Sequence, residues 1–253
     1  MKISLSGIQS LECSESLKQA MGRYAGELAE AIGDDLLGIY LYGSLARGCH
    51  HPVTSDVDII AVIKGSGVEP DKQAILQVHR NAGVSMDVVF VDERQVNMDV
   101  LAVPVCFLVK VKSMDDCTIV DVPEGRRDFL LQRQDTYEAG IALLGPTPQD
   151  LISPVPWPLL SESLDFLFPY IVTHFKNSVL MLCRIAYAWT HHKLCSKKQA
   201  GEWAGEEFGE HWEPVIKAAL AEYAGGEGTG ISKTTLHEFE QYCVGYIDNL
   251  RAD

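Results

Sequence analysis

Apolar residues along this chain follow two patterns, and the change between them lies at a proline-rich segment near the middle. Before that segment, short apolar runs typical of buried strands alternate with stretches of helical spacing, whereas after it only helical spacing continues. The first part is predicted to form strands at 36–42, 57–63 and 87–91, two further apolar stretches within 105–122 with a turn at 114–116, and helices at 16–32, 71–83 and 127–144.

The proline-rich segment predicts a linker between two domains. Five prolines lie between Gly145 and Pro158, too many for a helix or a central strand, and we assign 148–158 to the linker. The predicted helices beyond it cover residues 161–168, 172–191, 197–208, 213–223 and 232–250. The predicted fold is an α/β (α+β) N-terminal domain with a mixed sheet, residues 1–147, followed by an all-α helical bundle domain, residues 159–253.

Composition narrows the classes of partner. The formal net charge of −14 argues against binding to nucleic acid, because phosphate backbones are bound by basic patches. The same charge would attract a polycationic small molecule, although many acidic proteins carry such a charge for solubility alone. Seven cysteines show no CxxC pair, no signal peptide opens the chain, and the longest apolar run is shorter than about 18 residues. We therefore expect a cytoplasmic monomer that does not bind a membrane.

The segment that links the first two predicted strands carries the candidate chemistry. Asp56 and Asp58 occupy alternate positions at the start of the second strand, so strand geometry projects both carboxylates from one face. Two such charges repel each other unless a cation neutralises them, and Mg²⁺ typically uses one or two carboxylates plus substrate phosphates. Gly43 ends the first strand and lets the backbone approach a ligand, and Ser44 can begin a short helix whose N–H groups meet phosphate.

Each of these elements alone has an ordinary structural explanation. A Gly-Ser pair after a strand is often a turn with a helix cap, and an Asp-x-Asp is often a solvated strand edge. The combination within 41–63, with apolar strand residues around both motifs, is much more specific for a site that binds a nucleotide triphosphate and divalent cations.

The motifs LYGSLARG and SDVDI resemble those of the polymerase-β-like nucleotidyltransferase superfamily. In that superfamily the Gly-Ser binds triphosphate, the Asp-x-Asp binds Mg²⁺, and a third acidic residue lies on a neighbouring strand. Asp87, which opens the apolar run of the third predicted strand, matches that position. A strand-entry aspartate near a turn is the alternative explanation for Asp87.

The second half of the chain is similar to the streptomycin/spectinomycin adenylyltransferases, the aminoglycoside 3″- and 9-nucleotidyltransferases. The similar blocks are GPTPQDLISPVP at 145–156 and CRIAYAWTHHKLCSKKQAGEWA at 183–204. This resemblance implies that an arginine and a lysine of the helical domain, here Arg184 and Lys197, bind the nucleotide. The alternatives are a structural ion pair for Arg184 and an exposed first-turn lysine, after a capping Ser196, for Lys197.

Three departures from the family pattern bear on the acceptor. The third acidic residue, regarded in the family as the general base, is usually glutamate, so Asp87 is either a shorter base or a third metal ligand. The position of an acidic residue in the streptomycin-accepting enzymes is held here by His174, and their substrate-contacting tryptophan has no clear counterpart. Spectinomycin, or another hydroxylated amine, is therefore favoured over streptomycin.

Further polar residues are candidates with weaker support. Tyr170, His174 and Asn177 share one predicted helix face before Arg184 and are candidates to contact the acceptor, with ordinary packing as the alternative. Three residues of the loop after Ser44 are close in sequence to the nucleotide motif and are candidates to contact phosphate or gate the site. They are Arg47, His50 and His51.

The resemblance implies a transferase that uses ATP and two Mg²⁺ ions, held by Asp56, Asp58 and Asp87, to transfer AMP to a hydroxyl of an aminoglycoside or aminocyclitol antibiotic and so confer resistance. Two other functions remain open. One is a nucleotidyltransferase that modifies a protein, of the toxin-antitoxin type, and the other is a non-catalytic nucleotide sensor.

Overall fold

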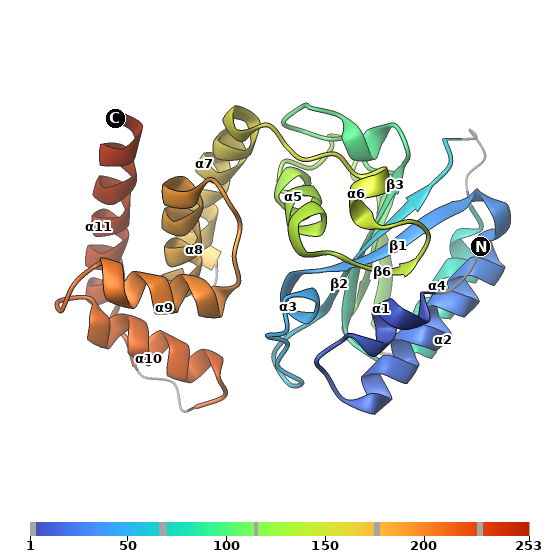
Figure 1. Cartoon of the computed structure of the whole chain (residues 1–253), viewed down its shortest axis with the longest axis horizontal. Coiled ribbons are helices and arrows are strands. Elements are labelled where there is room, and N and C mark those ends of the chain that lie inside the picture. The colour runs from blue at the N-terminus through green and yellow to red at the C-terminus, as the bar shows by residue number, and fades with distance from the viewer. Residues whose placement is uncertain (1–3, 66–69, 114–115, 175–177, 227–229, 253) are drawn as a thin grey trace. The chain divides into compact units, whose positions relative to one another are not determined.

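The structure is a computed structural model that describes residues 4–65, 70–113, 116–174, 178–226 and 230–252 (Figure 1). The chain divides into two compact units, Met1–Leu159 and Leu160–Asp253. The division falls in the first turn of α7, the helix Trp157–His174.

The first unit is built on a six-stranded sheet with the order β5-β4-β3-β2-β1-β6. Its strands are β1 (Leu36–Tyr42), β2 (Val57–Ile63), β3 (Met86–Asp92), β4 (Phe107–Val111), β5 (Cys117–Val120) and β6 (Ile141–Leu144). Strands β2 and β3 pair in parallel, and every other neighbouring pair is antiparallel. The predicted mixed sheet is confirmed. Among the strands that the structure describes, the parallel pair β2 and β3 is joined by a long crossover that contains the helix Lys72–Ala82.

The helices of this unit begin and end close to the predicted positions where caps are present. Ser14 accepts a hydrogen bond from the backbone of Leu17 at the start of α2, and Asp71 caps α4 in the same way. The helices are α1 (Leu5–Gln9), α2 (Glu15–Ile32), α3 (Gly43–Ala46), α4 (Lys72–Ala82), α5 (Phe129–Ala139) and α6 (Pro148–Leu151), with short 3₁₀ turns at Gly33–Asp35 and Gln95–Asn97.

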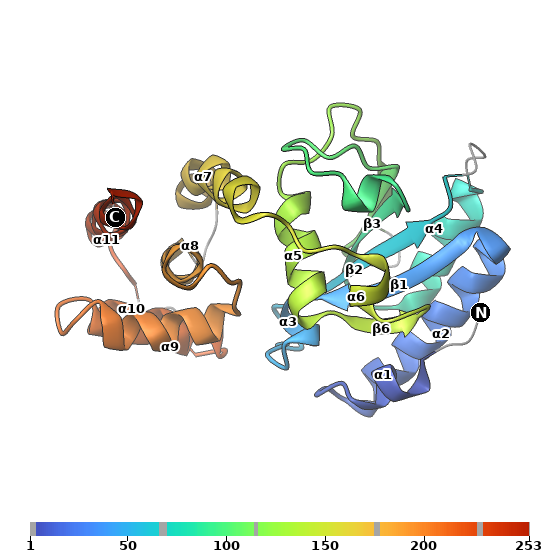
Figure 2. The same cartoon turned by 45° about the horizontal axis from the view of Figure 1, so that its top comes forward.

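The two faces of the sheet have different roles. Helices α2 and α4 lie side by side on one face, and α5 lies on the other, against β1 (Figures 1 and 2). The face under α2 and α4 buries the main apolar core, in which Met21 and Leu28 of α2 and Ile75 of α4 meet alternate residues of the strands. Because side chains alternate along a strand, the residues between these core positions point to the opposite face, and the candidate site is there.

The predicted helix at 127–144 is wrong in its last part. Helix α5 ends at Ala139, and residues Ile141–Leu144 form the edge strand β6, which pairs with β1. Gly140 takes an extended conformation after the helix, and a Cβ there would overlap the carbonyl oxygen of Thr136. The short apolar run after Gly140 is compatible with a helix or with a strand by its sequence alone. It forms a strand because the edge of β1 is available for pairing.

Prolines disrupt the helices less than their number predicts. Helix α6 begins at Pro148, within the predicted linker, and Pro158 lies in the first turn of α7. In the first turn of a helix the missing N–H of proline has no intrahelical partner to lose. Helix α7 also continues through Pro169, where a break between two predicted helices was expected.

The second unit consists of helices that surround α8 (Ser178–His191). Leu180, Cys183 and Ala186 of α8 are buried in its core. The helices that pack with α8 are α9 (Lys197–Glu207), α10 (Glu213–Tyr223) and α11 (Lys233–Ala252). The predicted all-helical second part is confirmed. In the described residues, no helix combines the length and apolar character needed to cross a bilayer.

Candidate active site

Asp58 and Asp87 are direct neighbours in the sheet. The parallel register of β2 and β3 pairs Asp58 with Asp87. Tyr42 of β1 is the neighbour of Asp58 on its other side, and Lys110 of β4 is the neighbour of Asp87. The prediction that Asp58 and Asp87 lie on neighbouring strands is confirmed. The register adds that the two residues stand in one row across the sheet, on the face opposite the main core.

The Gly-Ser turn lies directly against this row. Gly43 has a φ of +68°, and a Cβ at this position would overlap the carboxylate of Asp58. Glycine is therefore required here by its backbone conformation and also by the space that Asp58 occupies. Ser44 follows in α3, the short helix Gly43–Ala46 that begins at this contact.

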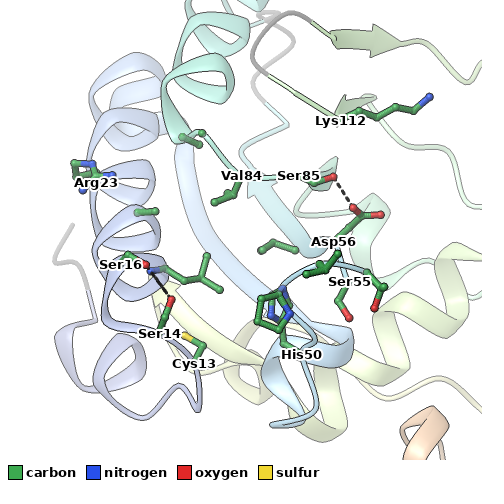
Figure 3. Close-up of a pocket in the computed structure, with 18 of the residues that line it drawn as sticks. Cys13, Ser14, Ser16, Arg23, His50, Ser55, Asp56, Val84, Ser85 and Lys112 are labelled. Atoms are coloured by element: carbon green, nitrogen blue, oxygen red, sulfur yellow. Dashed lines mark hydrogen bonds between the residues drawn. The ribbon is translucent and has the colours of Figure 1, made fainter. Parts of the chain in front are cut away.

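Asp56 lies just before β2, and one of its two carboxylate oxygens accepts a hydrogen bond from a neighbouring side chain. Its Oδ1 accepts a hydrogen bond from Ser85 Oγ at 2.5 Å, and Ser85 Oγ is also 3.0 Å from the carbonyl oxygen of Val111. Figure 3 shows this hydrogen bond at the edge of a hollow of about 800 Å³. Asp56 and His50 line the hollow together with residues from the start of α2 and the end of α4.

Asp87 is half-exposed and lies among cations. Its Oδ2 is 3.9 Å from Lys110 Nζ, and both side chains are nearly half exposed. Burial raises the pKa of the Asp87 carboxyl, while Lys110 and Arg126 lower it and Asp56 raises it further. Arg126 donates from Nε to Asp128 Oδ1 at 2.9 Å, so its charge is already shared with another carboxylate.

The site brings together residue types that suit Mg²⁺, with aspartates on adjacent strands beside a glycine that leaves them space. The side chains themselves do not yet form a metal cluster: in the described parts of the chain, no three His, Cys, Asp or Glu side chains are close enough to hold one ion. The roles of Asp56, Asp58 and Asp87 as metal ligands therefore stay a prediction.

Sequence reasoning missed several residues of this site. Ser85 precedes its strand and Lys110 lies within one, so only the register brings them to the aspartates. Asp135 of α5 binds the Gly-Ser turn, although it lies 92 residues after Gly43. The available signal was the polar run Gln132–Asp135 inside a helix, because some of its side chains must be buried in a helix that packs on a sheet.

The candidate residues of the loop after Ser44 have the following partners in the structure. Arg47 binds Asp135 and Glu138, so its guanidinium is directed to α5, and its role in contacting phosphate or gating the site stays a prediction. His51 Nδ1 is 3.1 Å from Thr54 Oγ1, within its own loop. His50 lines the hollow beside Asp56, and burial lowers its pKa.

The predicted residues of the second unit lie as follows. Arg184 donates from Nε to the carbonyl oxygen of Cys195 at 2.9 Å, which ties α8 to the start of α9. Lys197 lies in the first turn of α9 after the predicted cap at Ser196, with Nζ 5.6 Å from the centre of the Tyr223 ring. The backbone of His174 belongs to α7, but the structure does not describe its side chain, and Asn177 lies outside the described residues.

Comparison with known proteins finds a matching family for each half of the chain. Residues 24–113 match the family described as the nucleotidyltransferase domain, and residues 155–245 match the family described as the aminoglycoside adenylyltransferase C-terminal domain. The chain belongs to the aminoglycoside adenylyltransferase family. It is thereby an adenylyltransferase of the nucleotidyltransferase superfamily, as the Gly-Ser and Asp-x-Asp motifs predicted.

Relatives of this adenylyltransferase match along nearly its whole length. An aminoglycoside (3″)(9) adenylyltransferase of Klebsiella pneumoniae is 26% identical, with 90% of this chain and 96% of the relative covered. A corresponding enzyme of Escherichia coli is 25% identical, with 90% and 93% covered. A spectinomycin 9-adenylyltransferase of Campylobacter jejuni is 23% identical, with 78% and 82% covered.

A solved structure confirms the fold of this adenylyltransferase. It is the crystal structure of a spectinomycin adenyltransferase from Enterococcus faecialis with ATP and spectinomycin. The two structures align with a TM-score of 0.72 at 14% identity, covering 91% of this chain and 98% of the other.

Proposed function

We propose that this protein transfers AMP from ATP to a hydroxyl of an aminoglycoside or aminocyclitol antibiotic, and that it thereby confers resistance. The observation that carries the proposal is the pairing of Asp58 with Asp87 beside the turn of Gly43 and Ser44. The match of the helical part to the aminoglycoside adenylyltransferase C-terminal domain supports the class of acceptor.

The proposed reaction is an in-line displacement at the α-phosphate of ATP. The acceptor oxygen forms a bond to the α-phosphorus, the bond between the α- and β-phosphates breaks, and pyrophosphate leaves. Asp56, Asp58 and Asp87 would hold Mg²⁺, which supplies neutralisation of the charge on the triphosphate oxygens. Ser44 and the amides of its turn bind the triphosphate.

Asp87 has two possible roles in this reaction. It either accepts the proton of the acceptor hydroxyl or serves as a third metal ligand. Its pairing with Asp58 allows the second role, and its half-exposed position beside Lys110 allows the first. An Asp87→Asn variant assayed over a range of Mg²⁺ concentrations separates them, because excess Mg²⁺ restores activity only if a ligand was lost.

Residues of the second unit complete the proposed site. Arg184 and Lys197 are proposed to bind the nucleotide, and His174 and Asn177 to contact the acceptor, on the resemblance of the helical region. Arg184→Ala and Lys197→Ala are expected to raise the KM for ATP, whereas His174→Ala and Asn177→Ala are expected to raise the KM for the antibiotic.

Spectinomycin is the proposed acceptor in preference to streptomycin. Support comes from His174, which holds the place of an acidic residue in streptomycin-accepting enzymes, and from the solved relative that binds spectinomycin with ATP. The likeness to the Campylobacter jejuni spectinomycin 9-adenylyltransferase agrees with this choice.

A direct assay tests the function. The purified protein is incubated with ATP, Mg²⁺ and a panel that includes spectinomycin and streptomycin, and every component is then analysed by mass spectrometry. The expected result is spectinomycin that carries one AMP, with far less product from an Asp58→Asn variant. AMP on a protein, or no AMP on any acceptor, would contradict the proposal and favour a protein-modifying enzyme or a nucleotide sensor, respectively.

A further inference from the structure

Asp135 is a buried carboxylate that the reaction described above does not use. It lies on α5, and only 4% of its surface is exposed. Its Oδ2 accepts a hydrogen bond from the backbone N–H of Gly43 at 2.7 Å. Its Oδ1 accepts one from Arg47 Nε at 2.8 Å and lies 2.7 Å from Arg47 Nη2. One carboxylate therefore binds the first residue of the four-residue turn that carries Ser44 and the side chain of the residue that follows the turn.

The partners of Asp135 are themselves held in place. Arg47 Nη2 is also 3.3 Å from Glu138 Oε2, and Gln134 donates to Glu138 Oε1 at 2.9 Å. Burial alone would lower the pKa of Arg47, but Asp135 and Glu138 together raise it, so the guanidinium remains charged although its side chain is only 12% exposed. Buried charges that are paired in this way hold their geometry, because breaking one contact leaves the other charge without compensation.

The turn is thus fixed from two sides. Asp135 binds the N–H of Gly43, and Asp58 fills the space where a Cβ of Gly43 would stand. Since Gly43 uses its N–H for Asp135, the donors left for an anionic ligand are those that follow it, beginning with Ser44. The charge of Asp135 is neutralised by Arg47, which matters because an uncompensated carboxylate at this turn would repel a triphosphate.

We infer that Asp135 is a positioning residue for nucleotide binding: with Arg47 as its counter-ion, it holds the Gly43–Ala46 turn in the conformation that receives the triphosphate of ATP. Arg47 therefore acts on the nucleotide through Asp135 and not by contact with phosphate. This inference rests on the proposed function, because it specifies how the same site binds its nucleotide.

Three variants separate positioning from simple stability. Asp135→Ala removes both contacts of the carboxylate, whereas Asp135→Asn keeps an oxygen that can accept from Gly43 N–H. A double variant, Asp135→Leu with Arg47→Met, removes the ion pair of these two residues as a whole, which is often neutral for stability. Glu138 loses Arg47 in this variant but keeps the hydrogen bond from Gln134 and its partial exposure. The control for the loss of an ion pair on α5 is Asp99→Asn, because Asp99, which is half exposed, lies 2.9 Å from Arg133 of this helix.

The measurements are the affinity for Mg·ATP by calorimetry, the KM for ATP and kcat, and the unfolding temperature. Asp135→Ala should weaken Mg·ATP binding by about tenfold or more, the usual effect of a lost hydrogen bond to a charged group, while kcat changes less than the KM for ATP. Asp135→Asn should recover part of this loss. The double variant should regain thermal stability but not affinity, and the control should bind Mg·ATP as the wild type does.

Other results overturn the inference. If the Asp135 variants bind Mg·ATP like the wild type, or if the double variant recovers affinity together with stability, the carboxylate is only structural. A wild-type protein that does not bind Mg·ATP also overturns it. If the wild type and variants bind Mg·ATP as expected but transfer AMP to no antibiotic, the proposed function fails and the inference about the turn stands.

Discussion

The α-carbon of Gly43 lies against the carboxylate of Asp58, so that no larger residue fits at the end of β1 without moving the aspartate. This contact joins the two motifs on which the proposed chemistry depends. It also explains the glycine more fully than the need of a backbone to approach a ligand.

Gly43→Ala should therefore abolish AMP transfer and lower the stability of the fold. The new methyl group displaces Asp58, and an alanine at φ +68° costs about 1–2 kcal/mol in free energy of unfolding. Transfer is measured by mass spectrometry and stability by denaturant unfolding.

Gly83→Ala is the matched control for this variant. Gly83 has a nearly equal φ of +69°, but a Cβ there meets no atom within 4 Å. It should show a similar loss of stability with normal transfer. Equal activity of the two variants would show that the contact with Asp58 has no role in catalysis.

Asp58→Asn should reduce AMP transfer by about a hundredfold or more, because an amide replaces a charge on which the reacting phosphate depends. Asp56→Asn should act in the same direction. The fold should remain intact, since the neutral amide also relieves repulsion between Asp58 and its strand neighbour Asp87. Initial rates measure the loss of AMP transfer, and circular dichroism checks that the fold is intact. Full activity in either variant would exclude the proposed role of these aspartates in AMP transfer.

Ser85→Ala tests whether the hydrogen bond to Asp56 orients that carboxylate. Groups that orient a metal ligand typically contribute about 10- to 100-fold to metal affinity or activity. We expect the variant to need more Mg²⁺ for half-maximal transfer, with the rate largely recovered at saturating Mg²⁺. Ser16→Ala, at the exposed start of α2, is the control. An unchanged Mg²⁺ requirement would mean that Ser85 acts only on the carbonyl of Val111.

His79 makes the stability of the first unit depend on pH. Its Nδ1 donates to the carbonyl oxygen of Ile75 at 2.7 Å, so Nε2 of the neutral ring accepts from Tyr24 Oη at 3.2 Å. Burial lowers the pKa of His79 to about 4. The folded state thus disfavours protonation of His79. The contribution of the neutral ring to the free energy of unfolding is therefore complete above the ordinary pKa of 6.5 and is lost as the pH falls toward 4.

The expected loss from His79 is about 3 kcal/mol in free energy of unfolding over that range. Urea unfolding at a series of pH values measures it. His79→Leu should be less stable at neutral pH but should lose less on acidification than the wild type. An equally steep fall in both proteins would assign the pH dependence to other groups.

Much of the site could be predicted because it lies within one stretch of sequence. Gly43, Ser44, Asp56 and Asp58 follow one another along two strands whose apolar runs identify them, and the helix with its cap at Asp71 indicates how the next strand returns parallel to bring Asp87 alongside. Hydrophobic periodicity, helix caps and glycines at helix ends therefore predict the order of the strands and helices that carry these residues.

The rest depends on contacts between distant segments, which local pattern does not contain. Strand β6 exists because the edge of β1 is available, and Asp135 reaches Gly43 only because α5 packs against β1 and the turn that follows it. The partners of Arg47 could not be predicted for the same reason, since they lie about ninety residues later in the chain. Pro169 was expected to end a helix, but α7 continues through it.

Helix α5 binds two separate segments with neighbouring side chains. Arg133 and Gln134 hold the backbone at Ser153–Val155, whereas Asp135 and Glu138 hold the turn at Gly43–Arg47. A residue inserted or deleted between Gln134 and Asp135 would rotate one pair of attachments relative to the other by roughly 100°, so that the helix could no longer hold both segments. The spacing of side chains within α5 is thus constrained by two attachments at once, whereas connecting loops tolerate insertions and deletions.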